Sequence, residues 1–254
     1  MFRKFELYNG SLQELHQDKL LINTLNAHSF NTVRKDPAFL KALQASDILL
    51  PDGISVVLSA RWLQGKKIKK IAGNDLFNYE MERVNRKGGC CFFLGSSEST
   101  LSLIKKRAEK EYPLIQVHTY SPPYRSEFSE EESMKMINVI NSVNPDVLFV
   151  GMTAPKQEKW ASQYFNQINA DHVCCIGAVF DFYAGTVQRA PEWMISSGME
   201  WFYRLIMEPK RMWRRYLIGN TLFVAEILRE KMNPVRQSSP ISVVPSETIE
   251  VESN

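Results

Sequence analysis

Residues 145–180 read PDVLFVGMTAPKQEKWASQYFNQINADHVCCIGAVF, two short apolar runs on either side of a longer amphipathic segment. The runs at 147–150 and 173–176 are apolar at every position, which is typical of strands buried on both faces of a parallel sheet. The segment between them, 156–168, predicts a helix that begins after Pro155. The stretch therefore predicts a strand–helix–strand unit of an α/β protein.

The same alternation covers most of the chain. It predicts further strands at 20–24, 47–50, 90–94 and 115–119, and further helices at 31–44, 54–64, 74–87, 98–111 and 130–143. This rhythm favours a Rossmann-like, mostly parallel sheet with helices on both faces. Because ligands of such sheets bind beyond the carboxyl ends of the strands, the loops that follow the strands are the candidate site.

The rhythm ends near residue 198, which predicts three parts of the chain. Residues 1–197 form the α/β domain, and residues 198–232 form a helical appendage rich in arginine and aromatic residues. We expect the appendage to contain two helices broken at Pro209. The polar, proline-spaced residues 233–254 are expected to be a disordered tail.

Composition excludes several classes of protein. The chain has 254 residues, of which 44% are apolar and 23% charged, so it is neither disordered nor fibrous. Its 31 basic and 28 acidic residues give a net charge of +3, too small a bias to indicate a nucleic-acid-binding protein. Five basic residues nevertheless lie between Arg204 and Arg215, with Glu208 as the only acid among them. This patch suits an anionic bilayer surface or a lipid-linked phosphate, although a helical pair that packs its aromatic residues on the domain and exposes its arginines to water would look the same.

Cysteine usage and hydropathy indicate where the protein works. The four cysteines form two adjacent pairs within apolar runs, and neighbours on a strand point to opposite faces, so the pairs suit neither a metal site nor a disulfide. The first residues lack the apolar core of a signal peptide, and no stretch has the ~18 apolar residues of a spanning helix. We expect a cytoplasmic protein that contacts the inner face of the plasma membrane peripherally. The sequence leaves open whether it is a homo-oligomer.

Polar residues follow the first two predicted strands. Thr24 and Asn26 could hold a sugar or nucleotide by neutral hydrogen bonds, although Asn26 could equally cap the next helix. Asp52 lies in a Pro-Asp-Gly turn at the second strand end, where a carboxylate can act as general base. The alternative is that Asp52 only caps the helix at 54–64.

Later loops hold further candidates. A lysine-rich run ends at Lys70 before a glycine turn, which suits a diphosphate but also fits a solvated loop. Asp75 could contact substrate or complement a helix dipole, and Gln157 could contact substrate or belong to an ordinary capped helix. Asp-x-Asp is absent from the chain, so we expect no metal, with lysine and arginine neutralising any diphosphate.

Together and in this order, the motifs resemble the WecG/TagA/CpsF family of glycosyltransferases over roughly residues 20–216. The resemblance rests on Thr24-x-Asn26, Pro51-Asp52-Gly53, Ala72-Gly73-x-Asp75-Leu76, Pro155-Lys-Gln-Glu158, Arg189-Ala-Pro191, Glu200-Trp201, Arg204 and Glu208-Pro209-x-Arg211. It implies an inverting, metal-independent transfer, without a cofactor, from a UDP-sugar to a sugar on a polyprenyl diphosphate. The product would serve cell-surface polysaccharide synthesis. N-acetylmannosamine is the favoured donor sugar, with glucose, glucuronate or N-acetylmannosamine uronate as alternatives.

The resemblance also implies roles for individual residues. Asp52 would be the general base that deprotonates the acceptor hydroxyl. The substrate-binding residues would be Thr24, Asn26, Lys70, Asp75, Gln157, Arg204, Arg211 and Arg214. The three arginines, in the appendage, would close over the site and bind diphosphate. Arg211 and Arg214 are three residues apart, which places them on one face of a helix.

The sequence departs from the family pattern at three places. Lys70 stands where the family usually has arginine, Thr153 where it commonly has glycine, and Ser96-Ser97 replaces a glycine-rich turn. The last two motivate an alternative hypothesis, a catalytically silent nucleotide-binding or membrane-scaffold protein. A hydrolase or kinase-like enzyme is disfavoured, because the chain has neither a Gly-x-Ser-x-Gly elbow nor a P-loop.

Overall fold

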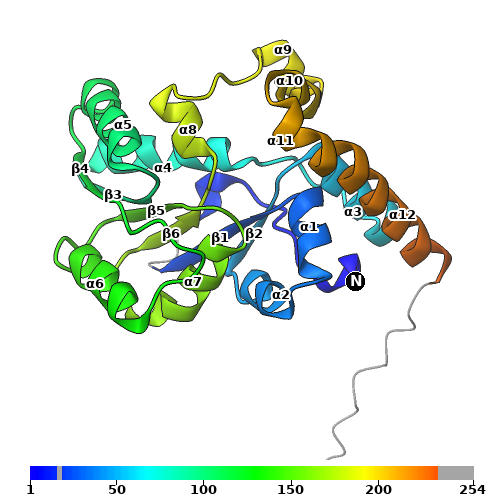
Figure 1. The fold of residues 1–254 in the computed structure, drawn as a ribbon, viewed down its shortest axis with the longest axis horizontal. Coiled ribbons are helices and arrows are strands. Elements are labelled where there is room, and N and C mark those ends of the chain that lie inside the picture. Colours follow the sequence, from blue (N-terminus) through cyan, green and yellow to red (C-terminus); the bar gives the residue numbers. More distant parts are fainter. Residues whose placement is uncertain (16–18, 234–254) are drawn as a thin grey trace, which may run out of the picture.

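The computed structural model describes residues 1–15 and 19–233, and its centre is a single sheet of six parallel strands (Figure 1). The strand order is β2-β1-β6-β5-β3-β4. The strands are β1 (Leu20–Leu25), β2 (Ile48–Pro51), β3 (Cys90–Gly95), β4 (Gln116–Tyr120), β5 (Val147–Gly151) and β6 (His172–Cys175). Each lies within one residue of its predicted bounds, and all neighbouring pairs are parallel. The predicted α/β fold class is confirmed.

Helices cover both faces of the sheet. One face carries α4 (Gly73–Lys87), α5 (Glu98–Glu111) and α8 (Val179–Ala184), and the other carries α6 (Glu130–Asn141) and α7 (Lys156–Tyr164). Successive strand residues supply both cores: Phe93 packs under the first set of helices and Phe92 under the second. Burial on both faces is why the inner strands β3 and β5 are apolar throughout, whereas the edge strand β4 is only partly buried and carries polar residues.

The helix predicted at 31–44 is wrong as a single element. The chain instead forms α1 (Ala27–Val33) and α2 (Pro37–Gln44). Asp36 starts the second helix, because its Oδ1 accepts a hydrogen bond from the Phe39 amide at 3.0 Å and Pro37 occupies the first helical position. The next helix, α3 (Ile54–Gln64), has the predicted bounds.

The C-terminal region folds as a chain of short helices. They are α9 (Glu192–Ser196), α10 (Glu200–Met207), α11 (Pro209–Trp213), the π-helical turn η4 (Arg214–Ile218) and α12 (Gly219–Met232). The break at Pro209 is confirmed, whereas α8, α9 and the π-turn have no counterpart in the prediction. The predicted disordered tail at 233–254 lies outside the described residues, apart from Asn233. Short 3-10 turns complete the description: η1 (Phe2–Lys4), η2 (Leu12–Glu14) and η3 (Phe165–Gln167).

Helix α12 anchors the C-terminal region to the rest of the chain. It runs beside α1 and α3 (Figure 1), and its Phe223 and Ile227 are buried in a core shared with those helices. Glu230 accepts hydrogen bonds from the backbone amides of Phe2 at 2.7 Å and Arg3 at 3.0 Å. At the other end of α12, Asn31 donates to the carbonyl of Gly219 at 2.6 Å. In the described part of the chain no helix is long and apolar enough to span a bilayer.

Candidate active site

Asp52 lies at the carboxyl end of β2, and its side chain does not cap a helix. Its backbone amide donates to the carbonyl of Leu25 at 2.9 Å, which joins the ends of β2 and β1. The residue that caps α3 is Gly53, at φ +127°, and the helix start has no side-chain cap. The capping role considered for Asp52 is therefore wrong, and its carboxylate is free for chemistry.

Asn26 combines the two roles considered for it. Its Oδ1 accepts from the Ser29 amide at 3.0 Å and so caps α1. Its Nδ2 donates to Oδ2 of Asp52 at 3.4 Å, which orients the carboxylate. Thr24 is half-buried two residues earlier, at the end of β1 and opposite Leu50 of β2. The ends of these two strands thus bring three of the predicted site residues together.

The surroundings of Asp52 are electrostatically mixed. Burial raises the pKa of its carboxyl and Glu200 raises it further, while the Asn26 hydrogen bond and the cations Lys70 and Arg215 lower it. Lys70 reaches this position because the next amide, that of Ile71, donates to the last β2 carbonyl at 3.1 Å. A carboxylate with a raised pKa accepts a proton from a hydroxyl more readily than an ordinary aspartate does.

Two predicted arginines gather beside Asp181, in α8 beyond the end of β6. Burial raises the pKa of the Asp181 carboxyl, and Arg211 and Arg204 lower it. Arg211 pairs with Glu208 at 2.7 Å. The Arg204 guanidinium carbon lies 5.3 Å from the centre of the Phe182 ring. Although the helix is broken at Pro209, both arginines therefore still act on the carboxylate of Asp181.

The third predicted arginine lies differently. Arg214 is exposed, and its guanidinium carbon is 5.2 Å from the ring centre of the neighbouring Trp213. Its successor Arg215 is partly buried and is the appendage arginine that acts on Asp52. The sequence did not single out Arg215, because residues three and four apart share a helix face and Arg211 is therefore compatible with either Arg214 or Arg215. It also assigned no role to Glu200 or Asp181, although Glu200 stood within a quoted motif.

Gln157 and Asp75 are engaged in the protein itself. Gln157 is buried, accepts from the Met152 amide at 3.1 Å and donates to Glu158 at 2.9 Å, so it holds the turn after β5. Oδ2 of Asp75 accepts from the Ala72 amide at 2.8 Å at the start of α4, as the helix-dipole alternative predicts. A substrate contact for either residue stays a prediction.

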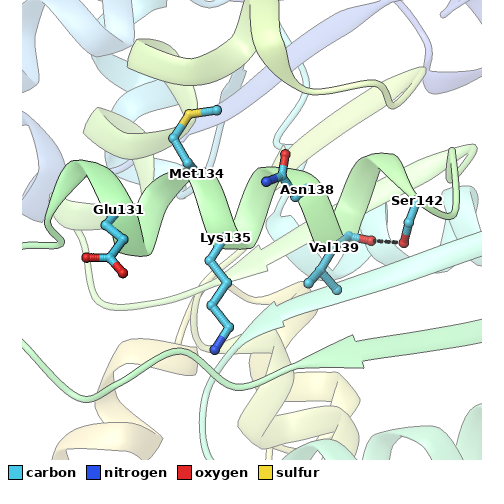
Figure 2. Close-up of a pocket in the computed structure, with 6 residues that line it drawn as sticks. All are labelled: Glu131, Met134, Lys135, Asn138, Val139 and Ser142. Atoms are coloured by element: carbon cyan, nitrogen blue, oxygen red, sulfur yellow. Dashed lines mark hydrogen bonds between the residues drawn. The ribbon is translucent and has the colours of Figure 1, made fainter.

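Two other features contribute no site residue. A shallow hollow on the solvent side of α6 is lined by that helix alone (Figure 2), with residues such as Lys135 and Asn138 and none from the strand ends. Among residues 1–15 and 19–233, no three or more His, Cys, Asp or Glu side chains cluster as metal ligands would.

Fold and site together define an α/β enzyme with a candidate base at a strand end and cations supplied by a C-terminal helical region. The chain matches the model of the glycosyl transferase WecG/TagA/CpsF family over residues 6–237, and it belongs to this family of enzymes.

Similar proteins carry a more specific name. The chain is 32% identical to an N-acetylglucosaminyldiphosphoundecaprenol N-acetyl-beta-D-mannosaminyltransferase of Bacillus subtilis, over 84% of this chain and 80% of the relative. Proteins of the same name from Bacillus spizizenii and Staphylococcus aureus strain MW2 are 31% and 26% identical, over 80% and 84% of this chain and 77% and 82% of their own length.

Proposed function

We propose that the protein transfers N-acetylmannosamine, with inversion, from its UDP conjugate to N-acetylglucosamine on a polyprenyl diphosphate. The names of the similar proteins support the transferred sugar and the acceptor. The observation that carries the mechanism is Asp52, a partly buried carboxylate that caps no helix and is faced by cations from a loop and from the appendage.

Asp52 would take the proton of the acceptor hydroxyl as the hydroxyl oxygen attacks C1 of the donor sugar. The new bond forms on one face of the sugar while the bond from C1 to the phosphate oxygen breaks on the other, so the configuration inverts. UDP leaves with the bonding electrons, and Lys70, Arg204 and Arg211 offset its growing negative charge. These cations would make a metal ion unnecessary. Thr24 and Asn26 would line the sugar pocket.

The appendage would bring the enzyme to the lipid at the cytoplasmic face of the plasma membrane. Trp201, Phe202 and Ile206 of α10 are exposed, and the cationic segment that begins at Arg204 overlaps this helix. Helix α3 adds a second exposed apolar stripe, Ile54, Leu58 and Trp62, beside α12. Aromatic and aliphatic side chains next to lysine and arginine are typical of surfaces that bind anionic bilayers.

The transfer is tested by incubating the protein with a short-chain lipid-diphosphate-N-acetylglucosamine and a panel of UDP-sugars. We expect UDP release and a disaccharide product with UDP-N-acetylmannosamine, in the β configuration, and equal rates with and without EDTA. Faster transfer from UDP-glucose, UDP-glucuronate or the N-acetylmannosamine uronate conjugate would replace the donor. Loss of activity in EDTA would contradict a metal-free mechanism, and no transfer from any donor would contradict the proposal.

Membrane binding is tested by sedimentation with anionic liposomes. Replacing Phe202 and Ile206 by serine should reduce the bound fraction severalfold, because each loses apolar area from the interface. The matched control is Leu103→Ser on α5, an equally exposed apolar residue on another helix. If both variants sediment alike, the appendage is not the docking surface.

A further inference from the structure

Helix α3 exposes a row of apolar side chains to solvent. Ile54, Leu58 and Trp62 follow one another at intervals of four residues, so they share one side of the helix, and they are 46%, 56% and 46% exposed. The opposite side of α3 is buried, with Val56 and Ala60 in the core shared with α1 and α12. Single exposed apolar residues are ordinary on a protein surface, whereas a continuous row indicates a surface that a partner covers.

Helix α12 extends this row. Nζ of Lys231 donates to the backbone carbonyl of Trp62 at 3.1 Å and lies 5.7 Å from the centre of the Trp62 ring. Val224 and Leu228 are exposed, and their spacing from Lys231 places them on the same side of α12. The two helices run side by side (Figure 1), so their apolar residues form one surface, the α3–α12 face: Ile54, Leu58, Trp62, Val224 and Leu228.

A lysine run follows the C-terminal end of α3. Gly65 ends the helix at φ +70°, and Ile68 is buried three residues later. Because this isoleucine fixes the short segment to the core, the lysines around it stay in water; the exposed ones are Lys66, Lys67 and Lys69. Three positive charges thus lie at the end of the apolar row.

The N-terminal turn η1 adds further cations. It packs against α3, and its Arg3 and Lys4 line a groove together with Lys66 and the acidic Glu6. Among residues 1–15 and 19–233, no carboxylate forms a salt bridge with Arg3, Lys4 or the exposed lysines of the run. This end of the α3–α12 face is therefore strongly cationic.

The other end of the α3–α12 face lies at the candidate active site. Ile54 follows the candidate base Asp52 by two residues. The start of the appendage passes over the same side chain, because a β-carbon on Gly198 would lie 3.4 Å from Cγ2 of Ile54. A partner that binds this face would therefore lie beside the strand end that carries Asp52.

The combination of charge and apolar area identifies the partner as an anionic bilayer. Its headgroups complement the cations, and its acyl region accepts the apolar row. A tryptophan beside a lysine, as in Trp62 and Lys231, is typical of a membrane–water interface, where the ring lies at headgroup depth. A second copy of the chain would bring the same cationic surface to a twofold interface and no acidic partner for it.

We propose that the lysine run and η1 bind the headgroup phosphates of anionic phospholipids while the α3–α12 face enters the acyl boundary. The α/β domain itself would then hold the membrane, in addition to the exposed residues of α10. The inference rests on the proposed function in one respect, that the enzyme works on a lipid acceptor at a bilayer. It places that bilayer beside Asp52.

The test is sedimentation of the full chain with vesicles of phosphatidylcholine, alone or mixed with an equal part of phosphatidylglycerol. We expect the wild type to bind the mixed vesicles about tenfold more tightly or better, because several basic residues meet the anionic surface. Salt at about 0.5 M should remove most of this difference by screening. Equal binding of the wild type to both kinds of vesicle overturns the proposal, whatever the variants do.

The double variant Lys66→Gln, Lys67→Gln should bind the mixed vesicles about fivefold more weakly or worse, since two charges leave the headgroup layer. The matched control is Lys105→Gln, Lys106→Gln, which removes two adjacent exposed lysines from α5 and should bind as the wild type does. Equal binding of the two double variants overturns the proposal. So does a loss confined to the variants of α10, which would leave the appendage alone at the membrane.

Leu58→Ser tests the apolar row and should weaken binding at low and at high salt, because it removes apolar area and no charge. Sedimentation velocity without lipid tests the other occupant: a wild-type dimer that Leu58→Ser dissociates would assign the face to a second copy and overturn the proposal. These measurements need no sugar substrate. A failure of sugar transfer would therefore contradict the proposed function and leave the binding result as it stands.

Discussion

The sheet and the appendage use their aromatic residues in opposite ways. Phe77, Phe93 and Phe149 are fully buried and lie with ring centres 5.1 to 6.2 Å apart in the core. In α10, by contrast, no residue is buried, and Trp201 and Phe202 pack on each other while both stay exposed. The sheet is stabilised by its own burial, whereas the first part of the appendage keeps apolar area available for another surface.

The largest expected effect is on the free energy of unfolding, and it distinguishes a buried phenylalanine of the sheet from an exposed one of the appendage. Phe149→Ala in β5 should reduce the free energy of unfolding by about 3–5 kcal/mol, because it removes a fully buried ring and leaves a cavity. Phe202→Ala in α10 should change it by no more than about 0.5 kcal/mol, since that side chain is 42% exposed. Urea unfolding followed by circular dichroism measures both. Equal costs would mean that α10 is packed as firmly as the sheet.

A smaller effect, on turnover, is expected at Asp52, where the end of β2 meets residues of the appendage. Asp52→Asn should lower turnover by about 100-fold or more, because amide nitrogen and oxygen cannot take the acceptor proton. The same change should raise the melting temperature, since burial disfavours the charged carboxylate in the folded state. Asp171→Asn, at a half-exposed position, is the matched control and should alter neither quantity.

The raised pKa of Asp52 also gives the transfer reaction a pH dependence. The base works only when ionised, so activity should fall as the pH drops through a value above the ordinary aspartate range. Lys70 and Arg215 oppose this shift, and Glu200 adds to it, so neutralising Glu200 should move the acidic limb to lower pH. Full activity of Asp52→Asn would remove Asp52 from the role of base.

The sheet could be predicted from sequence because most of its strands are short apolar runs, such as β3 and β5, between amphipathic segments. Two helices also have their predicted bounds, α3 and α5, since Gly65 ends the first and Ser97 caps the second. The break between α1 and α2 was missed because the apolar residues continue with helical spacing through Asp36 and Pro37. The cap formed by Asp36 and the proline at the first position of α2 end one helix and start another, although the apolar spacing continues through both.

The site could be predicted in part. The strand-end residues Thr24, Asn26 and Asp52 follow from the rule that ligands bind at the carboxyl edge of a parallel sheet. The choice between Arg214 and Arg215 did not follow, because a π-turn has no sequence signature of the kind that glycine or proline gives to other breaks. Which groups converge on Asp52 depends on long-range packing of the appendage, chiefly through Phe223 and Ile227.

The smallest expected effect is a change of the free energy of unfolding with pH, caused by a carboxyl group within the core. Glu158 in α7 is 2% exposed, its Oε2 has no hydrogen-bond partner, and burial raises its pKa to about 7. The unfolded chain has the ordinary value of 4.5, so the folded state binds the proton more tightly and loses stability as the pH rises between these values. Between pH 5 and pH 7 the loss should be about 2 kcal/mol.

Glu158→Gln should abolish this part of the pH dependence, because glutamine keeps the shape and can still accept from Gln157 but does not ionise. Urea unfolding at the two pH values measures it, with Glu109→Gln, an exposed residue of α5, as the control that should behave as the wild type. If Glu158→Gln loses as much stability as the wild type does over this range, Glu158 is already ionised at pH 5. The cost of its burial would then be offset within the core, and Asp52 would be the better example of a carboxylate kept at the expense of stability.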